Sequence, residues 1–103
     1  MQNTTKLALM CKSHNYTLDP YSNEYRVGNW VIGSKRQNEL VGETVVLTES
    51  QSSPAYLGGT IVGFVPVDNG KYEVIFKEDS AMVGNKDAIN HRGWGTGRGV
   101  CYV

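Results

Sequence analysis

The feature that most constrains the fold is a pair of apolar segments separated by a three-residue turn sequence. Residues 58–67 read GGTIVGFVPV, residues 68–70 read Asp-Asn-Gly, and residues 71–76 read KYEVIF. Two β-rich segments joined by a short turn that contains Asn-Gly are typical of an antiparallel hairpin. Gly63 interrupts the first segment, and a glycine inside a strand marks a bulge or a tight bend. The sequence therefore predicts a curled β-hairpin.

Other short apolar runs extend this β pattern. They cover residues 7–11, 29–34, 43–49 and 100–103, which makes about six strands with the hairpin. Turn-rich intervals between such strands are typical of a small barrel or sandwich. Helical signals are limited to residues 36–42 and to residues 78–90, where Asp79 or Ser80 would be the cap. We therefore expect a mainly β (α+β) fold of five or six strands with one or two short helices.

Length and charge exclude several classes of protein. A chain of 103 residues without a linker or repeat predicts one domain over residues 1–103. No apolar run approaches the roughly 20 residues that span a bilayer, and residues 7–11 are too short for a signal peptide, so we expect a cytoplasmic protein without a membrane partner.

Ten basic and ten acidic residues cancel, which disfavours non-specific nucleic-acid binding. A local basic patch is still compatible with this balance, and its candidates are Lys35, Arg36, Arg92 and Arg98, with ordinary solvated surface charges as the alternative.

The two cysteines offer little chemistry. Cys11 and Cys101 lie in apolar, strand-like runs, so we expect both to be reduced and buried. A disulfide and a zinc site with His14 and His91 are the alternatives, although the spacing of His91 and Cys101 matches no compact zinc motif. A catalytic Cys–His pair would need an exposed, electropositive setting. We therefore expect no metal, no cofactor and no catalytic residue.

The two tryptophans are the best candidates for ligand contacts. Residues 91–103 read HRGWGTGRGVCYV, which does not match the dinucleotide pattern G-x-G-x-x-G and precedes a strand rather than a helix. Trp30 and Trp94 each lie beside glycines and near a basic residue. A ring in such a setting can stack on a flat ligand, which is worth about 1–3 kcal/mol per base. The alternative is that each ring is a core residue that closes one mouth of a small barrel.

Two motifs resemble the PUA-like superfamily, particularly its EVE and ASCH branches. Residues 42–45, Gly-Glu-Thr-Val, resemble the GD-x-V turn of that family, with Glu in place of the usual Asp. Gly59, Ile61, Gly63 and Val65 resemble its G-x-I-x-G-x-V strand. The likeness extends over residues 28–103, while the segment before it matches poorly beyond an opening strand.

The resemblance implies a small pseudo-barrel and a non-catalytic role. EVE-like domains take a single base, often a modified one, from a DNA or RNA strand into an aromatic pocket, at a cost of a few kcal/mol of unstacking. The implied ligand-binding residues are Trp30 and Trp94 as stacking walls, Ser34 and Thr96 as hydrogen-bond partners of the base, Lys35 and Arg98 as phosphate contacts, and Gly58, Gly59 and Gly97 as points of close backbone approach. Because the net charge is zero, two alternatives stay open: a small flat ligand such as a nucleoside, and a protein-interaction role that includes a dimer through an exposed strand edge.

Overall fold

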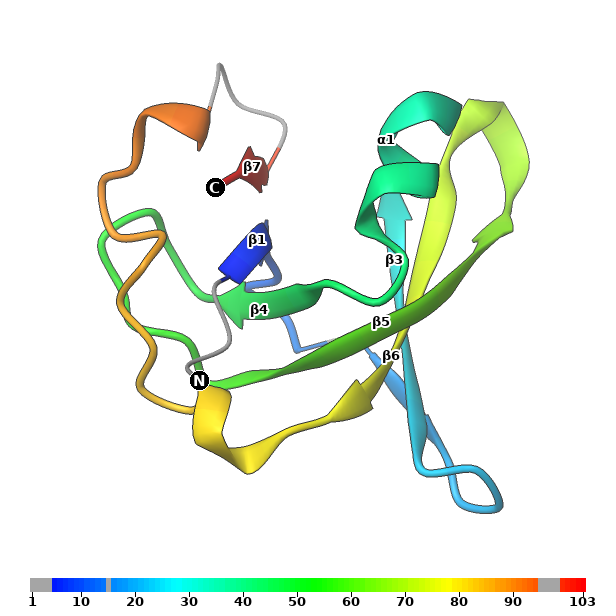
Figure 1. Ribbon diagram of the computed structural model, residues 1–103, viewed down its shortest axis with the longest axis horizontal. Coiled ribbons are helices and arrows are strands. Elements are labelled where there is room, and N and C mark those ends of the chain that lie inside the picture. The colour runs from blue at the N-terminus through cyan, green and yellow to red at the C-terminus, as the bar shows by residue number, and fades with distance from the viewer. Residues whose placement is uncertain (1–4, 15, 95–98) are drawn as a thin grey trace.

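The computed structural model describes residues 5–14, 16–94 and 99–103, and these form an open, curled β-sheet with one α-helix (Figure 1). The sheet order is β2-β3-β6-β5-β4-β1-β7, and β1 and β4 are its parallel pair. The elements are β1 (Thr5–Met10), β2 (Thr17–Asp19), β3 (Glu24–Trp30), α1 (Ser34–Leu40), β4 (Thr44–Thr48), β5 (Leu57–Pro66), η1 (Asp68–Gly70), β6 (Tyr72–Glu78), η2 (Ser80–Met82), η3 (Arg92–Trp94) and β7 (Val100–Tyr102), where η marks a single 3-10 turn.

The predicted hairpin is confirmed. β5 and β6 pair in antiparallel register and are joined by η1, in which Asn69 and Gly70 have φ angles of 65° and 71°. This left-handed conformation favours Asn and Gly over other residues. The register of the pair shifts between Ile61 and Gly63, which is the expected irregularity at Gly63.

The mainly β (α+β) class is confirmed, but the predicted pseudo-barrel of five or six strands differs from the structure in two respects. The described residues form seven strands, and β2 and β7 lie at opposite ends of the sheet order, so the sheet does not close. Sequence reasoning missed β2 because its three residues are all exposed and carry no apolar pattern. It also began the next strand at residue 29, whereas β3 already begins at Glu24.

The helical predictions are confirmed in part. The segment expected at residues 36–42 is the helix α1, which begins two residues earlier and ends at Leu40. In the second segment the only helical turn is η2, and Asp79 caps it by accepting a hydrogen bond from the amide of Ala81 at 3.0 Å. No described helix has the length and apolar character that crossing a membrane would require.

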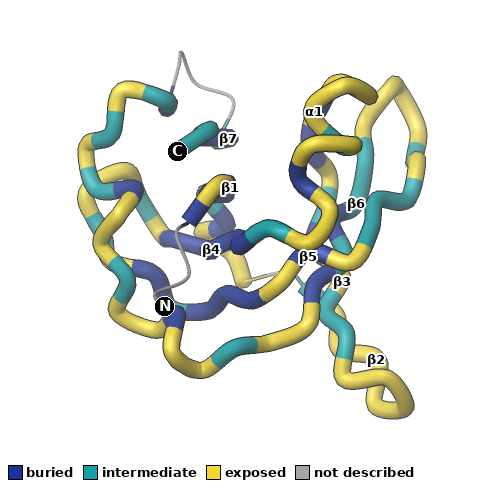
Figure 2. The backbone as a smooth tube through the Cα atoms, in the orientation of Figure 1, coloured by how far each residue is buried: buried dark blue, intermediate teal, exposed yellow. Residues whose placement is uncertain are grey.

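The core consists of two clusters of buried side chains on opposite faces of the central strands, and Figure 2 shows where buried residues lie along the chain. Side chains alternate between the two faces of a strand, so Leu7 and Leu9 of β1 enter one cluster and Ala8 enters the other. The first cluster, here called the inner one, includes side chains of β3, β6 and α1, whereas the second, the outer one, includes Met82 of η2 and Trp94 of η3. The buried members of the inner cluster are Leu7, Leu9, Cys11, Val27, Trp30, Ile32, Leu40, Val45, Leu47, Leu57, Ile61, Val74, Phe76 and Val100. Those of the outer cluster are Ala8, Val46, Ala55, Met82, Ala88, Trp94 and Cys101.

Candidate functional site

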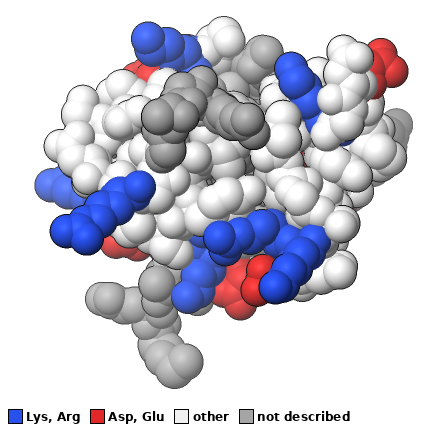
Figure 3. All heavy atoms as spheres, turned by 90° about the horizontal axis from the view of Figure 1, so that it is seen from above, with Lys and Arg blue, Asp and Glu red and all other residues white. Residues whose placement is uncertain are grey.

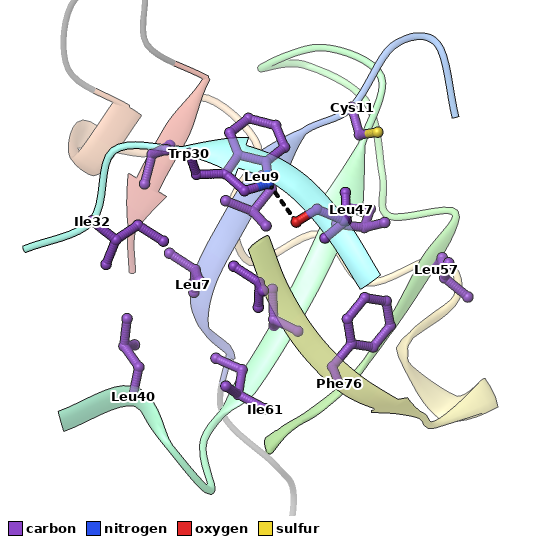
Figure 4. Close-up of a cluster of buried hydrophobic side chains, with 14 residues drawn as sticks. Leu7, Leu9, Cys11, Trp30, Ile32, Leu40, Leu47, Leu57, Ile61 and Phe76 are labelled. Carbon is purple, nitrogen blue, oxygen red and sulfur yellow. Dashed lines mark hydrogen bonds between the residues drawn. The ribbon is translucent and has the colours of Figure 1, made fainter. Parts of the chain in front are cut away.

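Trp30 ends β3 and packs in the inner cluster, where it is 8% exposed. Its indole N–H donates to the carbonyl oxygen of Val27 at 3.1 Å (Figure 4). A Cβ atom added to Gly99 would lie 3.3 Å from a carbon of this ring, so the chain leading into β7 passes directly against the indole. Trp30 therefore fills space between β3 and the chain before β7.

Trp94 lies in η3 and packs in the outer cluster, where it is 3% exposed. Its indole N–H donates to the carbonyl oxygen of Ala88. The two tryptophans thus occupy separate clusters on opposite faces of β1 and β4. The structure does not bring them together around one hollow, and it gives both rings the core role that the sequence left as an alternative.

The remaining predicted site residues are dispersed. Ser34 and Lys35 are exposed in the first turn of α1. Gly58 and Gly59 are buried in β5, where an added Cβ would meet backbone oxygens of β4 and β6 respectively. The close approach that these two glycines permit is therefore to neighbouring strands. The other members of the predicted site, Thr96, Gly97 and Arg98, lie outside the described residues.

The cysteines and histidines form two separate groups. Cys11 belongs to the inner cluster, and the ring of His14 stacks on that of Tyr56 at 3.9 Å. Cys101 belongs to the outer cluster, with its sulfur 3.7 Å from Nδ1 of His91. Burial raises the pKa of the Cys101 thiol, which opposes a nucleophilic thiolate at neutral pH. Among the described residues, no group of three or more His, Cys, Asp or Glu is placed to hold a metal ion.

Sequence reasoning missed a groove between α1 and β7. Its volume is about 310 Å³, and it contains both signs of charge. Residues three and four positions apart share a helix face, so Arg36, Glu39 and Leu40 of α1 all line it. The other lining residues are Lys6, Glu43, Tyr102 and Val103. Viewed from above, Lys and Arg atoms adjoin Asp and Glu atoms instead of forming an unbroken basic surface (Figure 3).

One wall of the groove is a cation–π pair. The guanidinium carbon of Arg36 lies 4.2 Å from the centre of the Tyr102 ring, well inside the range of about 6 Å for this interaction. Burial raises the pKa of Tyr102 and the charge of Arg36 opposes that rise, with burial the larger cause. Tyr102 is therefore a neutral phenol at pH 7, and the exposed guanidinium of Arg36 lies over its ring. No local pattern reveals this pair, because its members come from opposite halves of the chain.

A second hollow lies beside the β2–β3 hairpin, with a volume of about 510 Å³. It is lined by Leu18, Ser22, Asn23, Tyr25, Lys77 and Glu78. The nearby rings of Tyr16 and Tyr25 meet edge to face at 5.3 Å, and Tyr25 stacks on Phe76 at 5.4 Å. These rings pack against one another as a cluster and do not form an open cage.

No family model, curated protein or solved structure matches this chain. The resemblance to PUA-like domains therefore stays a prediction, and the motif glycines have explanations within the fold. Gly42 has a φ of 88°, which favours glycine. Gly59 packs against the backbone of Lys77, and Gly63 lies at the register shift of β5.

Proposed function

We propose that this protein is a non-catalytic binding module that holds a small flat ligand, of the nucleobase type, in the groove between α1 and β7. The observation that supports this most is Arg36 stacked over Tyr102 at 4.2 Å on the groove wall. Guanidinium planes and aromatic rings both serve as stacking surfaces for bases. Arg36 lies over the Tyr102 ring and is itself exposed, so its guanidinium plane is available to stack on a planar ligand.

The charges around the groove favour a free ligand over a nucleic-acid strand. Lys6 and Arg36 are balanced by Glu39 and Glu43, whereas strand binding depends on neutralising several phosphates. The edge of a base carries both donors and acceptors, and a mixture of ammonium and carboxylate groups can pair with both. The groove volume of about 310 Å³ is at the lower end of the range for small-ligand sites. A nucleoside or a similar flat metabolite fits these properties best.

The test is a titration of the protein with free nucleosides and with short single-stranded oligonucleotides, followed by NMR of the backbone amides. We expect a nucleoside to shift the amides of residues 34–40 and 100–103. The Arg36→Lys variant keeps the charge and loses the planar guanidinium, so binding should weaken about 5- to 150-fold, the range for one lost base stack. Lys35→Ala, which removes the neighbouring exposed cation, is the control and should bind as the wild type does.

Two results would contradict the proposal. One is equal binding by the wild type and by Arg36→Lys, which would show that the guanidinium of Arg36 does not stack on the ligand. The other is the absence of amide shifts with every nucleoside. Binding of oligonucleotides alone, weakening steeply with salt, would instead indicate a base presented by a strand.

A further inference from the structure

The outer edge of β2 is open. β2 is the first strand in the sheet order, and in the part of the chain that the structure describes no strand pairs with its other side. All three of its residues are exposed, and the β2–β3 hairpin projects from the body of the molecule (Figures 1 and 2). Leu18 at the centre of β2 is 47% exposed, and Tyr21 at the tip of the hairpin is 98% exposed. A free strand edge is a template for pairing with another strand.

The backbone of β2 directs one residue outward. The amide of Asn23 donates to the carbonyl oxygen of Asp19 at 2.9 Å, so the backbone of Asp19 faces the hairpin interior. Successive residues of a paired strand alternate between facing the partner strand and facing away from it. Leu18 therefore directs both its N–H and its C=O away from β3. Two copies of a strand can pair around a two-fold axis if at least one residue directs both its N–H and its C=O outward.

We propose that two copies of this chain pair their β2 strands in antiparallel register around a two-fold axis at Leu18. Each Leu18 then donates its N–H to the C=O of the other. On one face of the sheet, Leu18 is opposite Tyr25, which is opposite Phe76. The symmetric pairing places the two Leu18 side chains together and joins the two apolar rows into one, which covers the exposed leucine.

The charges on the opposite face select a second copy in this orientation. There, Thr17 is opposite Arg26 and Asp19 is opposite Glu24. Antiparallel pairing around Leu18 sets Thr17 opposite Asp19 of the second copy. The row of side chains that contains Arg26 and Thr17 of one copy therefore continues into the carboxylates of Asp19 and Glu24 of the other. A parallel pairing would set Asp19 opposite Asp19, and like charges directly opposite are destabilising. The edge is therefore complementary to itself in the antiparallel orientation.

Disulfide trapping tests the geometry of this dimer. Residues that form a hydrogen-bonded antiparallel pair have Cα atoms about 5.5 Å apart, within the range of about 4.4–6.8 Å for a disulfide. Leu18→Cys should therefore cross-link two copies under mild oxidation. Thr17→Cys is the matched control, because two Thr17 positions would be offset along the strands and about 7–8 Å apart, beyond the range for a disulfide. The native Cys11 and Cys101 are buried, so they do not compete.

Sedimentation equilibrium of the full chain provides an independent test. Leu18→Pro removes the outward N–H, which an edge strand tolerates, together with the leucine side chain. It eliminates both hydrogen bonds across the axis, so dimerisation should weaken about tenfold or more, while Leu18→Val should dimerise almost as the wild type does. A wild-type protein that is monomeric at about 1 mM, a concentration that detects affinities as weak as about −4 kcal/mol, would overturn the proposal. Equal cross-linking of Leu18→Cys and Thr17→Cys would overturn it as well.

Discussion

The polar end of each tryptophan explains why these rings belong to the core. A buried indole N–H needs a hydrogen-bond acceptor, and Trp30 and Trp94 find theirs in the carbonyl oxygens of Val27 and Ala88. The acceptor lies three residues before Trp30 and six residues before Trp94, so each ring folds back on its own segment. Both donors are therefore occupied within the fold and are not directed at a ligand.

Trp94→Ala should therefore destabilise the protein by about 3–5 kcal/mol, the range for truncating a core tryptophan. The change leaves a cavity in the outer cluster and deprives the Ala88 carbonyl of its donor. Trp94→Phe keeps most of the ring and loses mainly the hydrogen bond, which is worth about 0.5–1.5 kcal/mol. Urea denaturation measures both changes, and a loss below about 1 kcal/mol for Trp94→Ala would contradict the core role.

The strand β5 shows how one element uses glycines for different reasons. At Gly59 an added Cβ would collide with the backbone of Lys77 on β6. At Gly63 nothing lies within 4 Å of an added Cβ, and this glycine lies at the register shift between β5 and β6. The same residue type therefore permits close strand packing at one position and accompanies a bulge at the other.

Gly59→Ala should cost about 1–3 kcal/mol or more, because the strands must separate to accept the methyl group. Gly63→Ala has room and should change the free energy of unfolding by less than about 1 kcal/mol. Thermal or urea unfolding of the pair measures the difference. Equal effects of the two substitutions would show that the contact at Lys77 does not govern the choice of glycine.

The charge balance makes the whole molecule sensitive to acid. The backbone amide of Tyr21 holds the pKa of Asp19 below its ordinary value, and hydrogen bonds from Asn85 and Thr5 do the same for Asp87. A carboxylate with a lower pKa in the folded state stabilises the fold above the pKa of the unfolded chain, about 3.9. That contribution is lost as the pH falls through the folded-state value. Protonation of the carboxylates also leaves the ten Lys and Arg charges unbalanced.

We therefore expect the free energy of unfolding to decrease as the pH falls from about 5 to about 2. Asp87→Asn removes one of the two carboxyl groups whose pKa the fold lowers, so the dependence on pH should become shallower. Urea denaturation at a series of pH values measures both slopes. A slope for Asp87→Asn that equals the wild-type slope would show that this carboxylate does not contribute.

Local signals in the sequence determined the β5–β6 hairpin, the irregularity at Gly63, the position of α1 to within two residues and a cap at Asp79 or Ser80. Each of these depends on residues a few positions apart, and turn chemistry or periodicity reports such features directly. Only the tertiary structure decided which face of the sheet each tryptophan joins, how β2 extends the edge, and that Arg36 meets Tyr102. Those features depend on packing between segments distant in the chain, and a single sequence contains no signal for which of its surfaces will meet.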